Sequence, residues 1–241
     1  MTDQAQVSPV GAGEDAAGTF QRMLVIAARL FWTKGYAATT TREIARLVGL
    51  QKGSLYHHIE GKEELLYRLC IDALERVQEA AEQSVRQGTG ATDRLRRLIH
   101  HHVTSMLADR DKHATMLIEL RSLTGERRSE VIRLRDRYEA LVGEVIAEGQ
   151  REGVFRADIE PRYLTLSLLN LLNWTIFWFD PERPLSPEAL SQILSTIYIE
   201  GVNSLARRPD GWSQGSGGPN GRPVDIPDRA SENGTEDPEV P

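Results

Sequence analysis

Cysteine is almost absent from this sequence, since Cys70 is the single one among 241 residues. An intrachain disulfide is therefore impossible, and so is a zinc site built from several cysteine ligands. We expect Cys70 to pack as a small apolar side chain. Residues 1–18 also lack the basic start and apolar run that mark a secretory signal. The sequence thus favours a cytoplasmic protein.

The residue combinations that carry catalysis or metal binding are also lacking. No nucleophile is paired with a base, and no glycine-rich loop is placed to hold a phosphate. His100, His101 and His102 are consecutive, as are His57 and His58, and consecutive helical residues point about 100° apart, so neither run can chelate one ion. We therefore predict no enzyme, no cofactor and no metal site.

One long apolar run is present, from residue 163 to 179, and it reads YLTLSLLNLLNWTIFWF. It is slightly short for a comfortable membrane span, and its Ser, Thr and Asn side chains would be costly in lipid. A helix that is apolar on nearly every side is otherwise a buried one. We predict no membrane contact and place this helix between the core and a second subunit.

Charge is unevenly distributed along the chain. The net charge is −6, but residues 20–70 hold eight basic and four acidic residues, a net charge of +4, which leaves −10 for the remainder. A basic module on an acidic body is compatible with nucleic-acid binding. Chance drift in a window of this length explains the same asymmetry, so charge alone does not decide.

The ends of the chain differ from its middle. Residues 1–18 show no periodicity, and residues 207–241 hold six of the eleven prolines and six of the twenty glycines. We predict a disordered arm and a disordered acidic tail, because neither segment can bury enough apolar surface to offset its chain entropy. In residues 19–206 apolar positions recur at helical spacing without strand-like alternation, which predicts an all-α fold.

Two short helices are expected around Gly49. Residues 40–59 read TTREIARLVGLQKGSLYHHI, in which Thr40 can cap a first helix and Gly49 can take the positive φ of a turn. A second helix would then begin near Gln51 and run to about Ile59. Each helix is too short to be stable alone. A plain helical hairpin in an α-bundle fits this periodicity as well as a helix-turn-helix does.

Longer motifs decide between these interpretations. The pieces AARLFWTKGYAATTTREIARLVGL, KGSLYHHI and KEELL, within residues 19–66, resemble the N-terminal domain of the TetR family of bacterial transcriptional repressors. The resemblance implies a helix-turn-helix DNA-binding domain over residues 19–66 and a helical effector-binding and dimerisation domain over residues 67–206. It implies a homodimer that binds a pseudo-palindromic double-stranded DNA operator and responds to a small molecule.

The same resemblance implies roles for individual residues of the helix-turn-helix. Thr40, Thr41 and Arg42 would lie near the DNA backbone, and Lys62 would clamp a phosphate. The groove-facing part of the second helix would comprise Lys52, Gly53, Ser54, Tyr56 and His57.

A second, shorter resemblance lies in the C-terminal half. The run from Asn173 to Pro181 (NWTIFWFDP), with GQREGVF at residues 149–155, resembles a branch of TetR-like repressors that governs breakdown of fatty acids and sterols and responds to acyl-CoA thioesters. It implies an acyl-CoA-type effector. The candidate ligand-binding residues are Asn170, Asn173, Trp174, Trp178 and Arg121.

Two alternatives stay open at this point. Asn170, Trp174 and Trp178 are four residues apart and share one helix face, and an aromatic face of this kind also suits dimer or core packing. A helical acyl-CoA-binding protein or enzyme with an incidental N-terminal hairpin is the alternative to a regulator. Such an enzyme would need a general base close to the ligand, and the sequence offers only isolated candidates such as Glu119.

Overall fold

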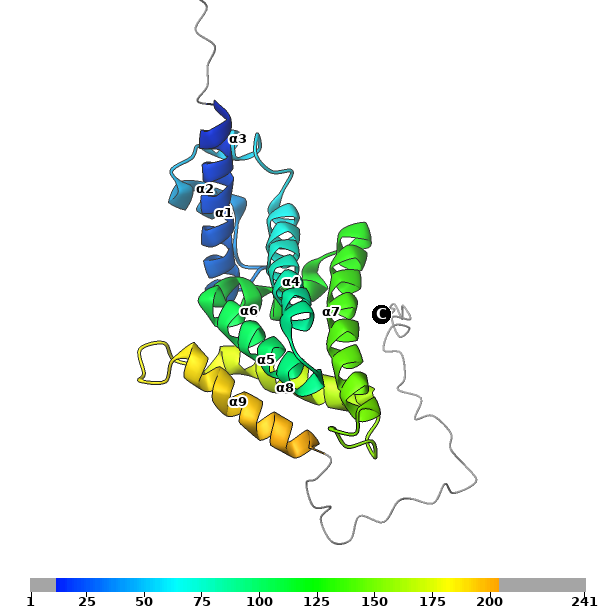
Figure 1. Ribbon diagram of the computed structural model, residues 1–241. Coiled ribbons are helices and arrows are strands. Elements are labelled where there is room, and N and C mark those ends of the chain that lie inside the picture. The colour runs from blue at the N-terminus through cyan, green and yellow to red at the C-terminus, as the bar shows by residue number, and fades with distance from the viewer. Residues whose placement is uncertain (1–11, 204–241) are drawn as a thin grey trace, which may run out of the picture. The chain divides into compact units, whose positions relative to one another are not determined.

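The computed structural model describes residues 12–203, with side chains from residue 18 onward except that of Lys52. Within that range every regular element is a helix, which confirms the all-α fold class (Figure 1). The elements are α1 (Ala12–Lys34), α2 (Thr41–Val48), α3 (Lys52–Leu55), α4 (Lys62–Gln87), α5 (Ala91–Ala108), α6 (Arg110–Glu119), the 3₁₀ turn η1 (Leu120–Ser122), α7 (Gly125–Arg151), α8 (Pro161–Trp178) and α9 (Pro187–Val202).

Helix α1 begins earlier than the sequence suggested. Residues 12–18, which we expected in a disordered arm, belong to the helix instead. Their sequence, AGEDAAG, explains the difference, because alanine has the highest helix propensity and acidic residues are favourable in a first turn. The rest of the predicted arm, residues 1–11, and the predicted tail, residues 207–241, lie outside the described residues.

The ends of α2 follow the predicted signals. The Thr40 side chain accepts a hydrogen bond from the Glu43 amide, and Gly49 ends the helix at φ +83°. Helix α3 is shorter than predicted, since it ends at Leu55 and not near residue 59. The amides of Tyr56 and His57 bond three residues back, so the chain tightens into 3₁₀-type turns after the helix-weakening Gly53.

The two larger of three hydrophobic clusters organise the described part of the chain. One contains buried residues of α1 to α4, among them Phe31 and Ile44, but also Met116 of α6 and Val131 of α7. The other joins α4, α5, α7, α8 and α9. The helix-turn-helix therefore shares its core with helices of the second domain. Cys70 is fully buried in the first core, as expected, and burial raises the pKa of its thiol to about 12, so it is chemically inert.

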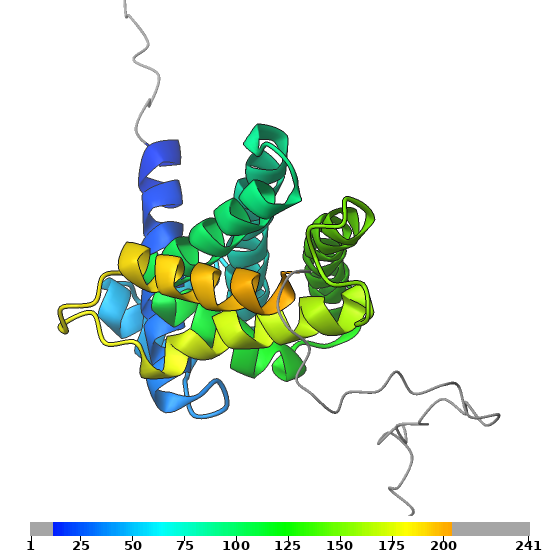
Figure 2. The same cartoon turned by 60° about the horizontal axis from the view of Figure 1, so that its bottom comes forward.

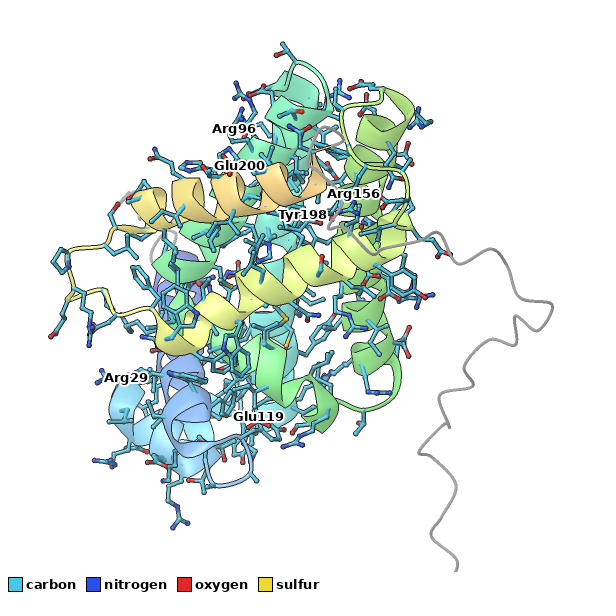
Figure 3. The ribbon with its side chains drawn as sticks, turned by 90° about the horizontal axis from the view of Figure 1, so that it is seen from below. Arg29, Arg96, Glu119, Arg156, Tyr198 and Glu200 are labelled. Atoms are coloured by element: carbon cyan, nitrogen blue, oxygen red, sulfur yellow. The ribbon has the colours of Figure 1, made fainter. Side chains whose placement is uncertain are left out.

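Helix α9 packs mainly on α5, and its C-terminal end approaches α8 (Figure 2). Tyr198 of α9 lies between α8 and α9 and donates a hydrogen bond to the Leu164 carbonyl of α8 (Figure 3). Helices α8 and α9 both bury one face in the second core and leave the opposite face exposed. None of the helices described is long and apolar enough to span a bilayer.

Candidate functional site

One face of the helix-turn-helix is polar and exposed. It includes Arg42 of α2, Gly53 of α3, and Tyr56 and His57 just after α3. The hydroxyls of Thr41 and Tyr56 are 3.2 Å apart, and this hydrogen bond ties α2 to the turn that follows α3. Tyr56 is 47% exposed, so its ring and hydroxyl are accessible. The structure thus gathers most of the residues expected to contact DNA.

The other predicted DNA-binding residues have more local roles or are not described. Thr40 is exposed but caps α2, and Ser54 is half-buried. Lys52 begins α3, and its side chain lies outside the described part of the structure. Arg46, which the sequence analysis did not select, is exposed like Arg42, and neither forms an ion pair with a described residue. Both arginines are available for phosphate.

Lys62, which we predicted to clamp a phosphate, bonds backbone carbonyls of the protein itself. Its ammonium donates hydrogen bonds to the carbonyls of Tyr36 at 2.7 Å and Thr39 at 2.9 Å, with a longer one to Ala37 at 3.4 Å. It also lies 4.2 Å from the centre of the Tyr36 ring. Partial burial lowers the pKa of Lys62. An ammonium has three N–H donors, and those of Lys62 bond the carbonyls of the α1–α2 turn.

A cavity of about 90 Å³ lies among the helices of the second domain. Five helices contribute to its lining, which is mostly apolar. The lining residues are Leu74 and Val77 of α4, His102 and Met106 of α5, His113, Met116 and Leu117 of α6, Arg135 and Tyr138 of α7, and Leu169 and Asn173 of α8. Arg135 is exposed and so marks the side of the cavity that reaches solvent.

Three polar side chains of the lining form a chain of hydrogen bonds. Burial lowers the pKa of His102 to about 4, so its imidazole is neutral at pH 7. Its Nε2 lies 3.2 Å from Oδ1 of Asn173, which can only accept, and its Nδ1 lies 2.7 Å from the Tyr138 hydroxyl. Nε2 therefore carries the proton and Tyr138 donates to Nδ1. This arrangement leaves the amide NH₂ of Asn173 without a partner among the described residues.

His113 is a second polar group of this cavity whose side chain has no partner among the described residues. It is 3% exposed, and its ring nitrogens make no hydrogen bond to any residue that the structure describes. Burial, foremost among several causes, lowers its pKa to about 4, so the ring is neutral and offers one N–H donor and one acceptor. Its ring nitrogens are not among the fully buried unpaired polar atoms of the described residues, and the residue lines the cavity. An imidazole that lines a cavity and has no protein partner is a candidate contact for a ligand.

Helix α6 connects the cavity to the helix-turn-helix. At its start, Lys112 forms ion pairs with Asp72 of α4 and with Asp109. Further along, the Thr115 hydroxyl donates to the Ala28 carbonyl of α1 at 3.1 Å. At its end, Glu119 accepts a hydrogen bond of 3.1 Å from the amide of Tyr36, and Figure 3 shows Glu119 close to the blue N-terminal helices.

The five predicted ligand-binding residues do not come together in this chain. Asn173 lines the cavity, whereas Asn170, Trp174 and Trp178 lie on the exposed face of α8, with Trp174 64% exposed. Arg121 is exposed in η1, about 12 Å along the chain from His113 at helical rise, and does not line the cavity. The cation of the cavity is Arg135.

Sequence reasoning missed His113 and Arg135. A signal for His113 existed, because it shares a helix face with Met116 and Leu117 at spacings of three and four. The charged residues next to His113 in RDKHATM obscured this shared helix face. Nothing in the sequence shows that the imidazole lacks a partner.

Comparisons with known proteins agree with both halves of this arrangement. Residues 24–69 match the family described as bacterial regulatory proteins, tetR family, and residues 88–202 match the tetracyclin repressor-like C-terminal domain. The HTH-type transcriptional repressor KstR2 of Mycolicibacterium smegmatis is 28% identical over 185 residues, which are 75% of this chain and 88% of that protein.

Two solved structures extend the comparison. The TetR family regulator PfmR from Thermus thermophilus has a TM-score of 0.69 and 34% identity, with 74% of this chain and 97% of that chain covered. AibR, solved in complex with isovaleryl coenzyme A and operator DNA, has a TM-score of 0.66 and 25% identity, covering 77% of this chain and 98% of that one.

Proposed function

Because this chain belongs to the TetR family of bacterial transcriptional regulators, we propose that it is a homodimeric repressor released from its operator by an acyl-CoA thioester. The observation that carries the proposal is helix α6. It lines the cavity with His113 and hydrogen-bonds the helix-turn-helix through Thr115 and Glu119.

The exposed face of the helix-turn-helix supports operator binding. The segment around Tyr56 and His57 would enter the major groove, while Arg42 and Arg46 of α2 would contact phosphates. Two such faces related by a two-fold axis would read half-sites about one helical turn of DNA apart, roughly 34 Å.

The outer faces of α8 and α9 support a homodimer. Large apolar side chains gather there with high exposure: Tyr163, Trp174, Phe177 and Trp178 on α8, and Ile193 and Ile197 on α9. Several large exposed apolar side chains on two helices of one domain are typical of an interaction surface. Pairing of the same surface from two copies would cover it. Under this proposal Asn170, Trp174 and Trp178 contribute to the subunit interface.

The cavity and its rim support an acyl-CoA effector. The apolar interior suits an acyl group, the amide of Asn173 offers donors, and Arg135 supplies a cation where phosphates would leave the cavity. KstR2 is named as a repressor, and the AibR structure combines an acyl-CoA with operator DNA. Their likeness to this chain favours the same class of ligand here.

Release would proceed through α6. A ligand that fills the cavity and contacts His113 would shift α6 slightly. The hydrogen bonds of Thr115 and Glu119 would pass that shift to α1 and to the α1–α2 turn. A coupling free energy of about 1–3 kcal/mol weakens operator affinity 5- to 150-fold.

A titration of the full chain against its own upstream intergenic DNA tests the regulator. Fluorescence anisotropy should show saturable binding that a scrambled duplex of equal length does not compete away. Affinity should fall steeply with salt because phosphate contacts release counterions. Equal affinity for the intergenic and scrambled duplexes would refute the proposal.

A further inference from the structure

The size of the cavity limits what it can hold. A cavity of about 150 Å³ lined by apolar side chains accommodates benzene, with its six carbons. By the same scale, 90 Å³ accommodates about three to five carbons. A long fatty-acyl chain or a sterol needs several times that volume.

The walls of the cavity are fixed on two sides. Lys112 holds the start of α6 to Asp72 of α4. Arg110 donates a hydrogen bond of 2.8 Å to the Ile176 carbonyl, which holds α6 to α8. A small shift of α6 can keep these contacts, whereas enlarging the cavity enough for a long chain would break them, so the volume acts as a size limit.

The polar groups of the cavity indicate what the ligand carries besides its hydrocarbon. His113 has no ring partner among the described residues, and the amide NH₂ of Asn173 is likewise left over. A purely apolar ligand would leave both donors unpaired. A carbonyl oxygen accepts two hydrogen bonds and satisfies them.

We infer that the acyl group of the effector is short, about three to five carbons, and that His113 donates a hydrogen bond to its thioester carbonyl. This inference rests on the effector class proposed above. It adds the chain length and the residue that recognises the carbonyl. Asn173 supplies the second donor, held in place by the hydrogen bonds of His102 and Tyr138.

Chain length is tested by calorimetric titration of the full protein with coenzyme A, butyryl-, isovaleryl-, octanoyl- and dodecanoyl-CoA. The two short thioesters should bind at least tenfold more tightly than dodecanoyl-CoA and than coenzyme A. The variant Met106→Ala, which enlarges the cavity, should move the preference toward octanoyl-CoA. Tighter binding of dodecanoyl-CoA to the parent protein would overturn the size limit.

The role of His113 is tested with S-butyl-CoA, a thioether that lacks the carbonyl oxygen. The parent protein should prefer butyryl-CoA over S-butyl-CoA by about tenfold, and His113→Leu should abolish that preference. His113→Gln keeps an N–H donor and should restore part of it. The inference is overturned if His113→Leu, folded by its melting curve, keeps the full preference.

These titrations separate the inference from the function on which it rests. Specific DNA binding that only long thioesters release, or that no thioester releases, overturns the inference and leaves a DNA-binding regulator. Absence of specific DNA binding overturns the regulator and the effector inference together.

Discussion

Replacing Lys62 by methionine separates a structural role from a phosphate contact. Methionine keeps an unbranched apolar stem but removes the ammonium that bonds the carbonyls of Tyr36, Thr39 and Ala37. We expect Lys62→Met to loosen the α1–α2 turn, on which α2 and its capping residue Thr40 depend for their position.

The magnitude follows from the contacts that are lost. A hydrogen bond to a charged group contributes about 1.5–3 kcal/mol. Because Lys62 is only half-buried, we take the low end for its two short bonds, which gives about 3 kcal/mol. The contact with the Tyr36 ring at 4.2 Å adds about 0.5 kcal/mol. For a chain of this size, a loss of about 3–3.5 kcal/mol lowers the melting temperature by roughly 6–14 °C.

The assay combines thermal unfolding with the salt dependence of operator binding, and Arg42→Met is the matched control. Lys62→Met should melt earlier and bind DNA more weakly, with an unchanged slope of log affinity against log salt. Arg42→Met should keep its melting temperature and lose about one unit of that slope. A Lys62→Met protein that melts like the parent and loses one unit of slope would refute the reasoning.

Three further predictions address the DNA face, the dimer and the buried histidines. Tyr56→Ala should weaken operator binding at least tenfold in an anisotropy titration while the melting temperature changes by only a few degrees; parent-like affinity would remove Tyr56 from the DNA face. Ile197→Glu should yield a monomer by light scattering, whereas Val25→Glu, at a similarly exposed position on α1, should stay dimeric; a dimeric Ile197→Glu would relocate the interface. His102 and His113 have pKa values of about 4 when folded and about 6.5 when unfolded, so the unfolded chain binds more protons between those values and stability falls as pH falls. Each histidine should cost about 2 kcal/mol between pH 7 and 5 in urea unfolding, and His113→Leu should remove about half of the loss; an unchanged loss would contradict a buried neutral His113.

Helix boundaries were predictable where a local signal sets them. Thr40 and Gly49 bound α2 because a side-chain cap and a positive φ are properties of single residues. Ser186 followed by Pro187 starts α9 for the same reason, and the Ser186 hydroxyl accepts a hydrogen bond from the Ala189 amide. The early end of α3 was not predicted, since a 3₁₀-type turn preserves the apolar spacing of a helix.

The candidate site was predictable only in part, because its parts depend on tertiary packing. The sequence places Asn173 and Trp174 next to each other, but only the packing of α8 shows that one lines the cavity and the other faces outward. The sequence suggests that Lys62 is a free cation, and only the folded chain brings the carbonyls of the α1–α2 turn around it. His113 becomes a candidate only when the absence of a ring partner among the described residues is seen.

The central claim is that filling the cavity releases DNA, and one titration tests it most directly. Operator affinity of the full chain is measured by anisotropy with and without saturating butyryl-CoA, and again with His113→Leu. We predict 5- to 150-fold weaker operator binding by the parent protein in the presence of butyryl-CoA. His113→Leu should bind the operator as the parent does and need about tenfold more butyryl-CoA for release. Identical operator affinity with and without every thioester of the series, at concentrations that saturate the protein, would contradict the account.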